Sequence, residues 1–279
     1  MGLSVQTNLA ALNAANNLTK TQNQLAGSLQ KLSSGFRINT AADDAAGLAI
    51  SEGMRSQMGG IKVGIRNAQD GISVVQTAEG ALNETTSILQ RMRDLTVQGA
   101  NTGALTTDAS KNIQTEITKL QSTLDGIGKN TSFNGQALLK GTYASDFQVG
   151  ANTGETINVT IGTDASALGL SVDSLSLAAL DGTQTNVTAM GNVAKIDTAI
   201  AKVSTERANL GATQNQFDHT INNQNVALQN VTASESRIRD TDMAATMVDF
   251  TKSQILSQAG TAMLAQAKSL PQDVLKLLQ

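Results

Sequence analysis

Apolar residues recur at intervals of seven along two long stretches of the chain. In the first stretch a second apolar row accompanies the main one at Met58, Ile65 and Ile72. Two such rows form a stripe along one face of an α-helix that packs against other helices. Near Glu79 a different row takes over, and this change predicts an altered winding of the helix without an end. The main row consists of Met54, Ile61, Ala68, Val75, Leu82 and Leu89, and the later row of Ala81, Ile88 and Leu95.

Seven glycines interrupt this first helical stretch between positions 47 and 80. Each glycine in a helix interior costs about 1 kcal/mol relative to alanine. Such a helix gains if its glycines allow close backbone packing against neighbouring segments. The alternative is a loop break near Gly59 and Gly60.

The second long stretch predicts a helix from about Met190 to Ile238. Its main row is Ile196, Val203, Leu210 and Phe217, continued by Gln224, Val231 and Ile238. Its companion row is Val193, Ile200, Ile221 and Leu228, interrupted by Arg207 and Gln214. A helix this long needs cover for its stripe, so we expect it to pack against the helix from Met54 and a shorter one over Asp108–Ile127. Asp108 is the expected N-cap of the shorter helix, and Gly126 and Gly128 are its expected stop signals.

Between these helices the periodicity changes to that of β-strands. Residues 147–149 and 156–161 alternate in the period-two manner of half-buried strands. Turn signals stand at 134–135, 152–154 and 181–182. The region from 130 to 182 therefore predicts a small β-rich cap where the long helices reverse direction.

The two ends of the chain are amphipathic and carry no core of their own. A chain that runs out and back brings both ends to the same pole, where they pair and still expose an apolar stripe. Exposed stripes of this length indicate an interface. The residues predicted to pack there are Leu9, Leu18, Leu25, Leu32, Met243, Met247, Phe250, Ile255, Leu256, Met263 and Leu264. The predicted fold is mainly α: an elongated rod of long antiparallel, coiled-coil-like helices with a small β-hairpin segment and paired terminal helices.

The amino-acid composition excludes several classes of function. The 279 residues contain 2% aromatics, no cysteine and one histidine, His219, which excludes cysteine chemistry and multi-histidine metal sites. A net charge of −3 with interspersed charges argues against nucleic acid as a partner. No run of about 18 apolar residues predicts membrane insertion, and the first residues do not resemble a cleaved signal peptide.

No pattern in the chain predicts catalysis. Adjacent Asp43 and Asp44 point to different sides of a helix, so we expect them to serve a helix start rather than acid–base chemistry. His219 is expected at the edge of the apolar seam or on the surface. We therefore predict a non-enzymatic protein with no catalytic residues, metal or cofactor.

Long motifs at both ends resemble the bacterial flagellins. The N-terminal motifs are LQKLSSGFRIN at 29–39, AADDAAGLAI at 41–50, RNAQDGIS at 66–73, TAEGAL at 77–82 and LQRMRDL at 89–95. The C-terminal motifs are ESRIRDTDMA at 235–244 and QAGTAMLAQA at 258–267, and FQVGA at 147–151 is a short match between them. Together they cover roughly residues 1–140 and 185–279.

The resemblance implies a self-assembling subunit of an extracellular bacterial flagellar filament that serves swimming motility. Residues 1–42 and 240–279 would form an inner helical domain lining the filament channel. Residues 43–239 would form the outer helical domain, with the β-rich segment at 130–182 in place of large variable domains. The resemblance also implies export through the flagellar type III apparatus, a chaperone at about 242–279, and hook-associated and cap proteins at the filament ends.

A further implication is recognition of the free subunit by vertebrate Toll-like receptor 5. Arg91, Leu95 and Glu116 match the positions that carry this recognition in the family; packing between subunits is the alternative role for them. Two other functions stay open: a hook–filament junction protein, which shares flagellin-like ends, and a secreted coiled-rod adhesin.

Overall fold

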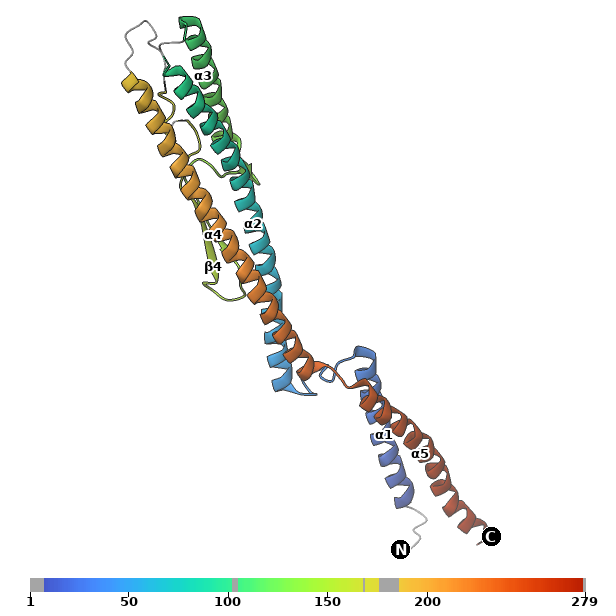
Figure 1. Ribbon diagram of the computed structural model, residues 1–279. Helices are drawn as coiled ribbons and strands as arrows, with labels where there is room; N and C mark the ends of the chain where they lie inside the picture. Colours follow the sequence, from blue (N-terminus) through green and yellow to red (C-terminus); the bar gives the residue numbers. More distant parts are fainter. Residues whose placement is uncertain (1–7, 102–104, 168, 176–185, 278–279) are drawn as a thin grey trace. The chain divides into compact units, whose positions relative to one another are not determined.

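The computed structural model describes residues 8–101, 105–167, 169–175 and 186–277. The helices within these ranges are α1 (Leu9–Ser34), α2 (Ala45–Gly99), α3 (Thr107–Asn130), α4 (Asn186–Arg239) and α5 (Met243–Leu277) (Figure 1). The strands are β1 (Ser132–Phe133), β2 (Gln136–Ala137), β3 (Tyr143–Gln148) and β4 (Thr156–Ile161). The chain divides into two compact units, residues 1–57 with 229–279 and residues 58–228, and the boundaries fall inside α2 and α4. The predicted mainly α fold, with long helices and a small β-hairpin segment, is confirmed.

The buried face of α2 keeps one heptad register over its whole length in the second unit. Most of its buried positions alternate in steps of three and four, at 61, 64, 68, 71, 75, 78, 82, 85, 89, 92, 96 and 99, and Val74 and Leu95 are buried next to this pattern. The main apolar row of the sequence is therefore confirmed from Ile61 to Leu89. The expected later row does not replace it near Glu79, because Leu82 and Leu89 stay buried, but Leu95 of that row is buried too. The true companion row contains glycine and threonine, which a count of apolar residues overlooks. Thr85 sits in this row because its hydroxyl donates to the carbonyl of Ala81 at 2.9 Å.

Two of the α2 glycines let a neighbouring backbone approach the helix. A Cβ on Gly64 would lie 2.6 Å from the carbonyl of Val149, and one on Gly60 would lie 2.7 Å from the Cβ of Ala151. The expected close packing is confirmed at these positions. The alternative loop break is wrong, because α2 runs unbroken through Gly59 and Gly60.

α4 packs antiparallel against α2 in the second unit. Three contacts fix the direction, since Arg93 pairs with Asp197 and Glu79 with Arg207, while Gly71 faces Phe217. The main row of α4 is buried from Ile196 to Phe217, as predicted. The predicted companion row is confirmed in part, because Ile200 and Ile221 are partly buried against the core. The fully buried positions of the second row are Asn192, Ala199 and Glu206. Glu206 is accommodated because the hydroxyl of Thr163 donates to its carboxylate at 3.0 Å.

α3 lies beside α2 and is bounded differently from the prediction. Its N-cap is Thr106, whose hydroxyl accepts from the backbone N–H of Ala109 at 3.3 Å, and not Asp108. Gly126 and Gly128 lie inside the helix rather than at its end. Gly128 is instead a close-approach position, because a Cβ there would lie 2.8 Å from the backbone nitrogen of Ser166.

The strands form two antiparallel pairs, β1 with β2 and β3 with β4. Asn134 and Gly135 both have positive φ, 48° and 80°, as the tight turn between β1 and β2 requires. The predicted strands at 147–149 and 156–161 correspond to the end of β3 and to β4. The segment does not cap a reversal of the helices, because it packs along their sides: Val149 contacts α2 at Gly64, and the Phe147 ring meets Phe217 of α4 edge-on at 5.8 Å. The turn signal at 181–182 lies outside the described residues.

Candidate functional site

The loop between α1 and α2 is built by side-chain caps. α1 ends at Gly35, which has a φ of 75° and donates its backbone N–H to the carbonyl of Lys31. The Asp44 carboxylate accepts from the N–H of Gly47 at 2.9 Å and so caps α2. Asp43 holds the loop, because its carboxylate accepts from the backbone N–H groups of Asn39 and Thr40. Hydrogen bonds from Thr40 keep the pKa of Asp43 below its ordinary value. The predicted helix-start role is thus confirmed for Asp44.

The residues after α1 pair with the residues between α4 and α5, and we call residues 35–37 and 239–241 the terminal clasp. Phe36 and Asp240 form an antiparallel bridge. The N–H of Arg37 donates to the carbonyl of Arg239 at 2.6 Å, and the N–H of Thr241 donates to the carbonyl of Gly35 at 3.0 Å. The Arg37 guanidinium also donates to the carbonyl of Ile238 at 2.6 Å. The clasp therefore joins the two ends of the chain through the backbone.

The side chain of Arg239 packs this clasp onto α2. Its guanidinium lies 4.8 Å from the centre of the Phe36 ring and 2.6 Å from a carboxylate oxygen of Glu52. Arg55 reaches the same oxygen of Glu52 at 3.0 Å. The hydrogen bond from Arg239 is the main reason that the pKa of Glu52 is lowered, and Arg55 adds to it. Only 12% of the Arg239 side chain is exposed, so the charge of Glu52 compensates a largely buried cation.

α1 and α5 lie side by side and run antiparallel (Figure 1). The Asn8 amide donates to the carbonyl of Ala267 at 2.7 Å, and Leu18 lies against Gly260, where an added Cβ would be 3.2 Å from its Cδ1. The predicted pairing of the two ends is confirmed. The pair is thin, however, because no residue of α1 is fully buried.

The predicted packing residues of the two ends divide into two groups. Leu18, Leu25, Leu32, Phe250 and Leu264 are half-buried. The others remain exposed, and so does Val248, which the sequence reasoning missed although Ile255 and Leu256 follow it at seven and eight residues. We call the exposed group the terminal apolar surface; its members are Leu9, Leu12, Leu29, Met243, Met247, Val248, Ile255, Leu256 and Met263, at 47–67% exposure.

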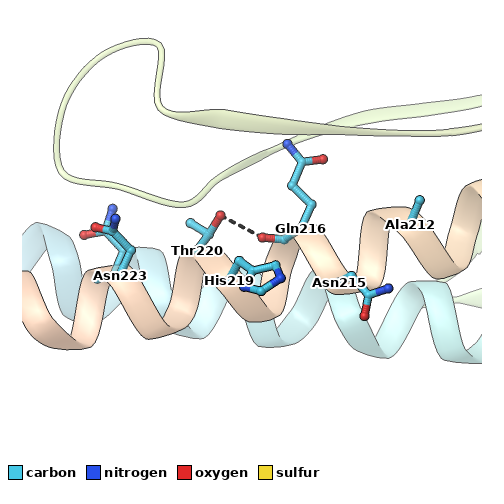
Figure 2. Close-up of a pocket in the computed structure, with 7 residues that line it drawn as sticks. Ala212, Asn215, Gln216, His219, Thr220 and Asn223 are labelled. Atoms are coloured by element: carbon cyan, nitrogen blue, oxygen red, sulfur yellow. Dashed lines mark hydrogen bonds between the residues drawn. The ribbon is translucent and has the colours of Figure 1, made fainter.

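The remaining surface offers little that suggests chemistry. His219 is exposed on α4 and lies in a shallow groove lined by side chains of that helix alone. Figure 2 shows the Thr220 hydroxyl donating to the Gln216 carbonyl beside it, at 2.8 Å. Among the described residues no group of three His, Cys, Asp or Glu side chains could hold a metal ion. In the same residues no helix is long and apolar enough to cross a membrane.

Arg91 and Glu116 come together across α2 and α3, while Leu95 lies below them. The guanidinium and the carboxylate are 2.7 Å apart, and the Arg91 side chain is 56% exposed. Leu95 is 2% exposed and belongs to the core of the second unit. Arg91 and Glu116 are therefore accessible at the surface, whereas Leu95, which the sequence placed in the same patch, is buried beneath them.

The chain resembles known proteins along almost its whole length. The bacterial flagellin N-terminal helical region matches residues 5–144, and the bacterial flagellin C-terminal helical region matches residues 193–278. The chain is 48% identical to a flagellin of Bacillus subtilis (strain 168), with 99% of this chain and 100% of the relative covered. It is 43% identical to a flagellar filament 33 kDa core protein of Treponema phagedenis, with 99% of each covered.

A solved structure shows a similar fold at low identity. The structure of a putative flagellar hook-associated protein from Vibrio parahaemolyticus has a TM-score of 0.61 with this chain and 17% sequence identity. It covers 71% of this chain and 100% of its own. At that identity the likeness concerns the fold alone.

Proposed function

The chain belongs to the bacterial flagellin family, and from this premise we propose that it polymerises through the terminal apolar surface of α1 and α5. As a member of the family it is a structural subunit of the extracellular flagellar filament, which serves motility. Beyond this, we propose which surface drives assembly and which other proteins bind the subunit.

The observation that carries the proposal is the exposure of large apolar side chains on a thin helix pair. Leu9 is 67% exposed, Ile255 66% and Met263 65%, although all three lie on well-formed helices. Burying apolar surface contributes about 25 cal/mol per Å², so cover by neighbouring subunits would stabilise α1 and α5 substantially. A pair with no fully buried residue in α1 has little packing of its own to offset the entropy of ordering. We therefore expect these helices to order fully only in the polymer.

We propose that the two ends of the chain form one domain of the filament subunit and the middle of the chain the other. Residues 1–42 and 240–279 would form the inner domain that lines the filament channel. Residues 43–239 would form the outer domain, with the β-rich segment at its side. The terminal clasp supports this assignment, because it lies where both ends enter the inner domain.

Deletion of residues 1–36 tests the proposal. The shortened chain should remain soluble because α2, α3 and α4 keep their core, and it should form no filaments. A full-length chain under the same conditions is the control, and circular dichroism before and after polymerisation should show a gain of helix. Filaments from the shortened chain, or unchanged helix content in the full chain, would refute the proposed mechanism.

Further partners follow from the same surface. We propose that an export chaperone covers about residues 242–279 before secretion through the type III apparatus, since Ile255, Leu256 and Met263 would otherwise associate too early. Hook-associated and cap proteins would meet the same surface at the filament ends. A junction protein or an adhesin is less well supported, because the 48% identity to a flagellin extends over 99% of this chain.

The patch around Arg91 and Glu116 is proposed to bind Toll-like receptor 5 in the free subunit. Its support is the exposure of the ion pair on α2 and α3 together with the buried Leu95 that positions it. The polymer would hide the same patch between subunits. We propose no catalytic role for any residue.

A further inference from the structure

A groove opens between α1 and α5 beside their contact. Gln24, Gly27, Ser28 and Lys31 line it from α1, and Asp249, Lys252, Ser253 and Leu256 line it from α5. Its volume of about 380 Å³ is roughly a dozen times the share of one water molecule in the liquid. The groove therefore has room for a long side chain.

The floor of the groove is kept open by small residues. A Cβ added to Gly27 would meet no atom within 4 Å, so nothing within the described fold requires glycine at this helical position. Glycine inside a helix is unfavourable relative to alanine. The absence of a side chain at Gly27 keeps the groove open, and we take this as the reason for the unfavourable glycine.

Ser253 lines the groove from α5 and is 6% exposed. Its hydroxyl can donate a hydrogen bond to a polar group that enters the groove.

The rim of the groove carries a net positive charge. Lys31 and Lys252 stand on opposite helices, and neither ammonium group lies within ion-pair distance of a described carboxylate, including Asp249. Hydrogen bonds are the main cause of the lowered pKa of Asp43, which lies outside the groove, and Lys31 adds to it by a long-range electrostatic interaction without an ion pair. The donors that line the groove are two ammonium groups, the hydroxyls of two serines and the Gln24 amide, a set that suits a carboxylate.

We propose that this groove, named here the lysine groove, receives an acidic side chain from a second copy of the chain and so fixes the register of assembly. The inference rests on the proposed polymerisation and adds a specific contact to it. The charge distribution supplies the complementary partner: α1 and α5 contain five lysines and two aspartates, whereas the rest of the chain has 15 basic and 21 acidic residues. A neighbouring subunit thus offers an excess of carboxylates to a surface that has an excess of lysines.

The first test removes the charge. The double variant Lys31→Gln with Lys252→Gln should raise the critical concentration for polymerisation about tenfold, because an acidic side chain would enter without its counter-charge. The double variant Lys20→Gln with Lys268→Gln removes one exposed lysine each from α1 and α5 outside the groove and is the matched control. The expected result is a tenfold rise for the groove variant and a wild-type value for the control. Equal effects of both would show a general electrostatic contribution and overturn the proposal.

The second test fills the groove without weakening the subunit. Gly27→Leu places a side chain where the fold has free space, so the thermal unfolding midpoint of the subunit should stay level or rise. Its critical concentration should nevertheless increase, since the groove can no longer accept a neighbour. Opposite changes in subunit stability and assembly are not produced by a folding defect. Normal assembly of Gly27→Leu would overturn the proposal.

Failure of the lysine groove and failure of the polymerisation mechanism give different results. If the wild-type chain polymerises and the groove variants polymerise equally well, the lysine groove is refuted while the apolar mechanism stands. If the wild-type chain does not polymerise at all, the proposed function fails and takes the groove with it. Carbodiimide crosslinking of assembled filaments, with half of the subunits isotope-labelled, should join Lys31 or Lys252 to a carboxylate of another copy; links confined to single copies would contradict the proposal.

Discussion

Arg239 and Glu52 form a 2.6 Å ion pair although they are 187 positions apart in the chain. Arg239 ends α4 and Glu52 lies one to two turns into α2. Because the Phe36 ring covers the guanidinium, the pair ties the terminal clasp to the start of α2. The ionic part of the connection between the terminal clasp and α2 therefore depends on one carboxylate.

Acidification should weaken this connection through Glu52. Its folded pKa is lowered from the ordinary value of 4.5, so the ion pair stabilises fully above that value and is lost as the pH falls through the folded pKa. Exchange protection factors, which are corrected for the intrinsic pH dependence of amide exchange, should fall for residues 35–52 between about pH 5 and pH 3 in the wild type. Glu52→Gln should have low protection factors at both pH values. Glu84→Gln, on the exposed face of α2, is the control; a wild-type profile in Glu52→Gln would contradict the role of the pair.

The Asp44 cap should be measurable as a stability effect. Asp44→Ala removes the acceptor for the N–H of Gly47 and should lower the free energy of unfolding by about 1 kcal/mol. Asp44→Asn keeps a side-chain acceptor and should retain most of that stability. Chemical denaturation of the three proteins measures the difference. Equal losses in both variants would mean that charge, and not the cap, is responsible.

Gly71 should tolerate no side chain, because Phe217 fills the space above it. A Cβ at Gly71 would lie 2.5 Å from Cζ of Phe217, and the edge-on Phe147 ring restricts the movement of Phe217. Overpacking of about 1–3 kcal/mol should outweigh the helix-propensity gain of about 1 kcal/mol, so Gly71→Ala should be destabilised. Gly80→Ala, with no atom within 4 Å of the added Cβ, should instead be stabilised by up to about 1 kcal/mol. Thermal unfolding distinguishes the two, and a stabilised Gly71→Ala would disprove the contact.

Recognition by Toll-like receptor 5 should depend on Arg91. Arg91→Asp reverses the charge next to Glu116 and should abolish activation of receptor-bearing reporter cells by free subunits. Arg66→Asp makes the same charge change at an exposed position of α2 and should signal normally. We would abandon the proposed receptor role if Arg91→Asp signalled like the wild type.

The periodicity of the sequence predicted the long helices and the main row of each packing face, but not the whole of each companion row. Ile61, Val75 and Leu89 were found because they are large and apolar. The companion positions Gly71 and Thr85 were missed because their burial depends on what faces them: the Phe217 ring in one case and the helix's own carbonyl in the other. The same limit misplaced the β segment, since the close approach of Val149 to Gly64 has no periodic signature.

The candidate site was predictable as a surface and not as individual contacts. Leu9 and Ile255 each belong to a row of apolar residues with helical spacing, and these rows predicted an apolar face on each terminal helix. Their exposure indicates that the described fold leaves that face open. Arg239 gave no such signal. Its importance comes from Phe36 and Glu52, which lie far away in the sequence and near only in the folded chain.

The terminal clasp also sets an order of events. The Arg37 guanidinium donates to the carbonyl of Ile238, which lies 201 positions later in the chain, so the contact needs both segments to be present. In a subunit that is exported as an unfolded chain, this contact can form only after both residues have left the export channel. Pairing of the two ends of the chain would therefore be a late step in the folding of an exported subunit.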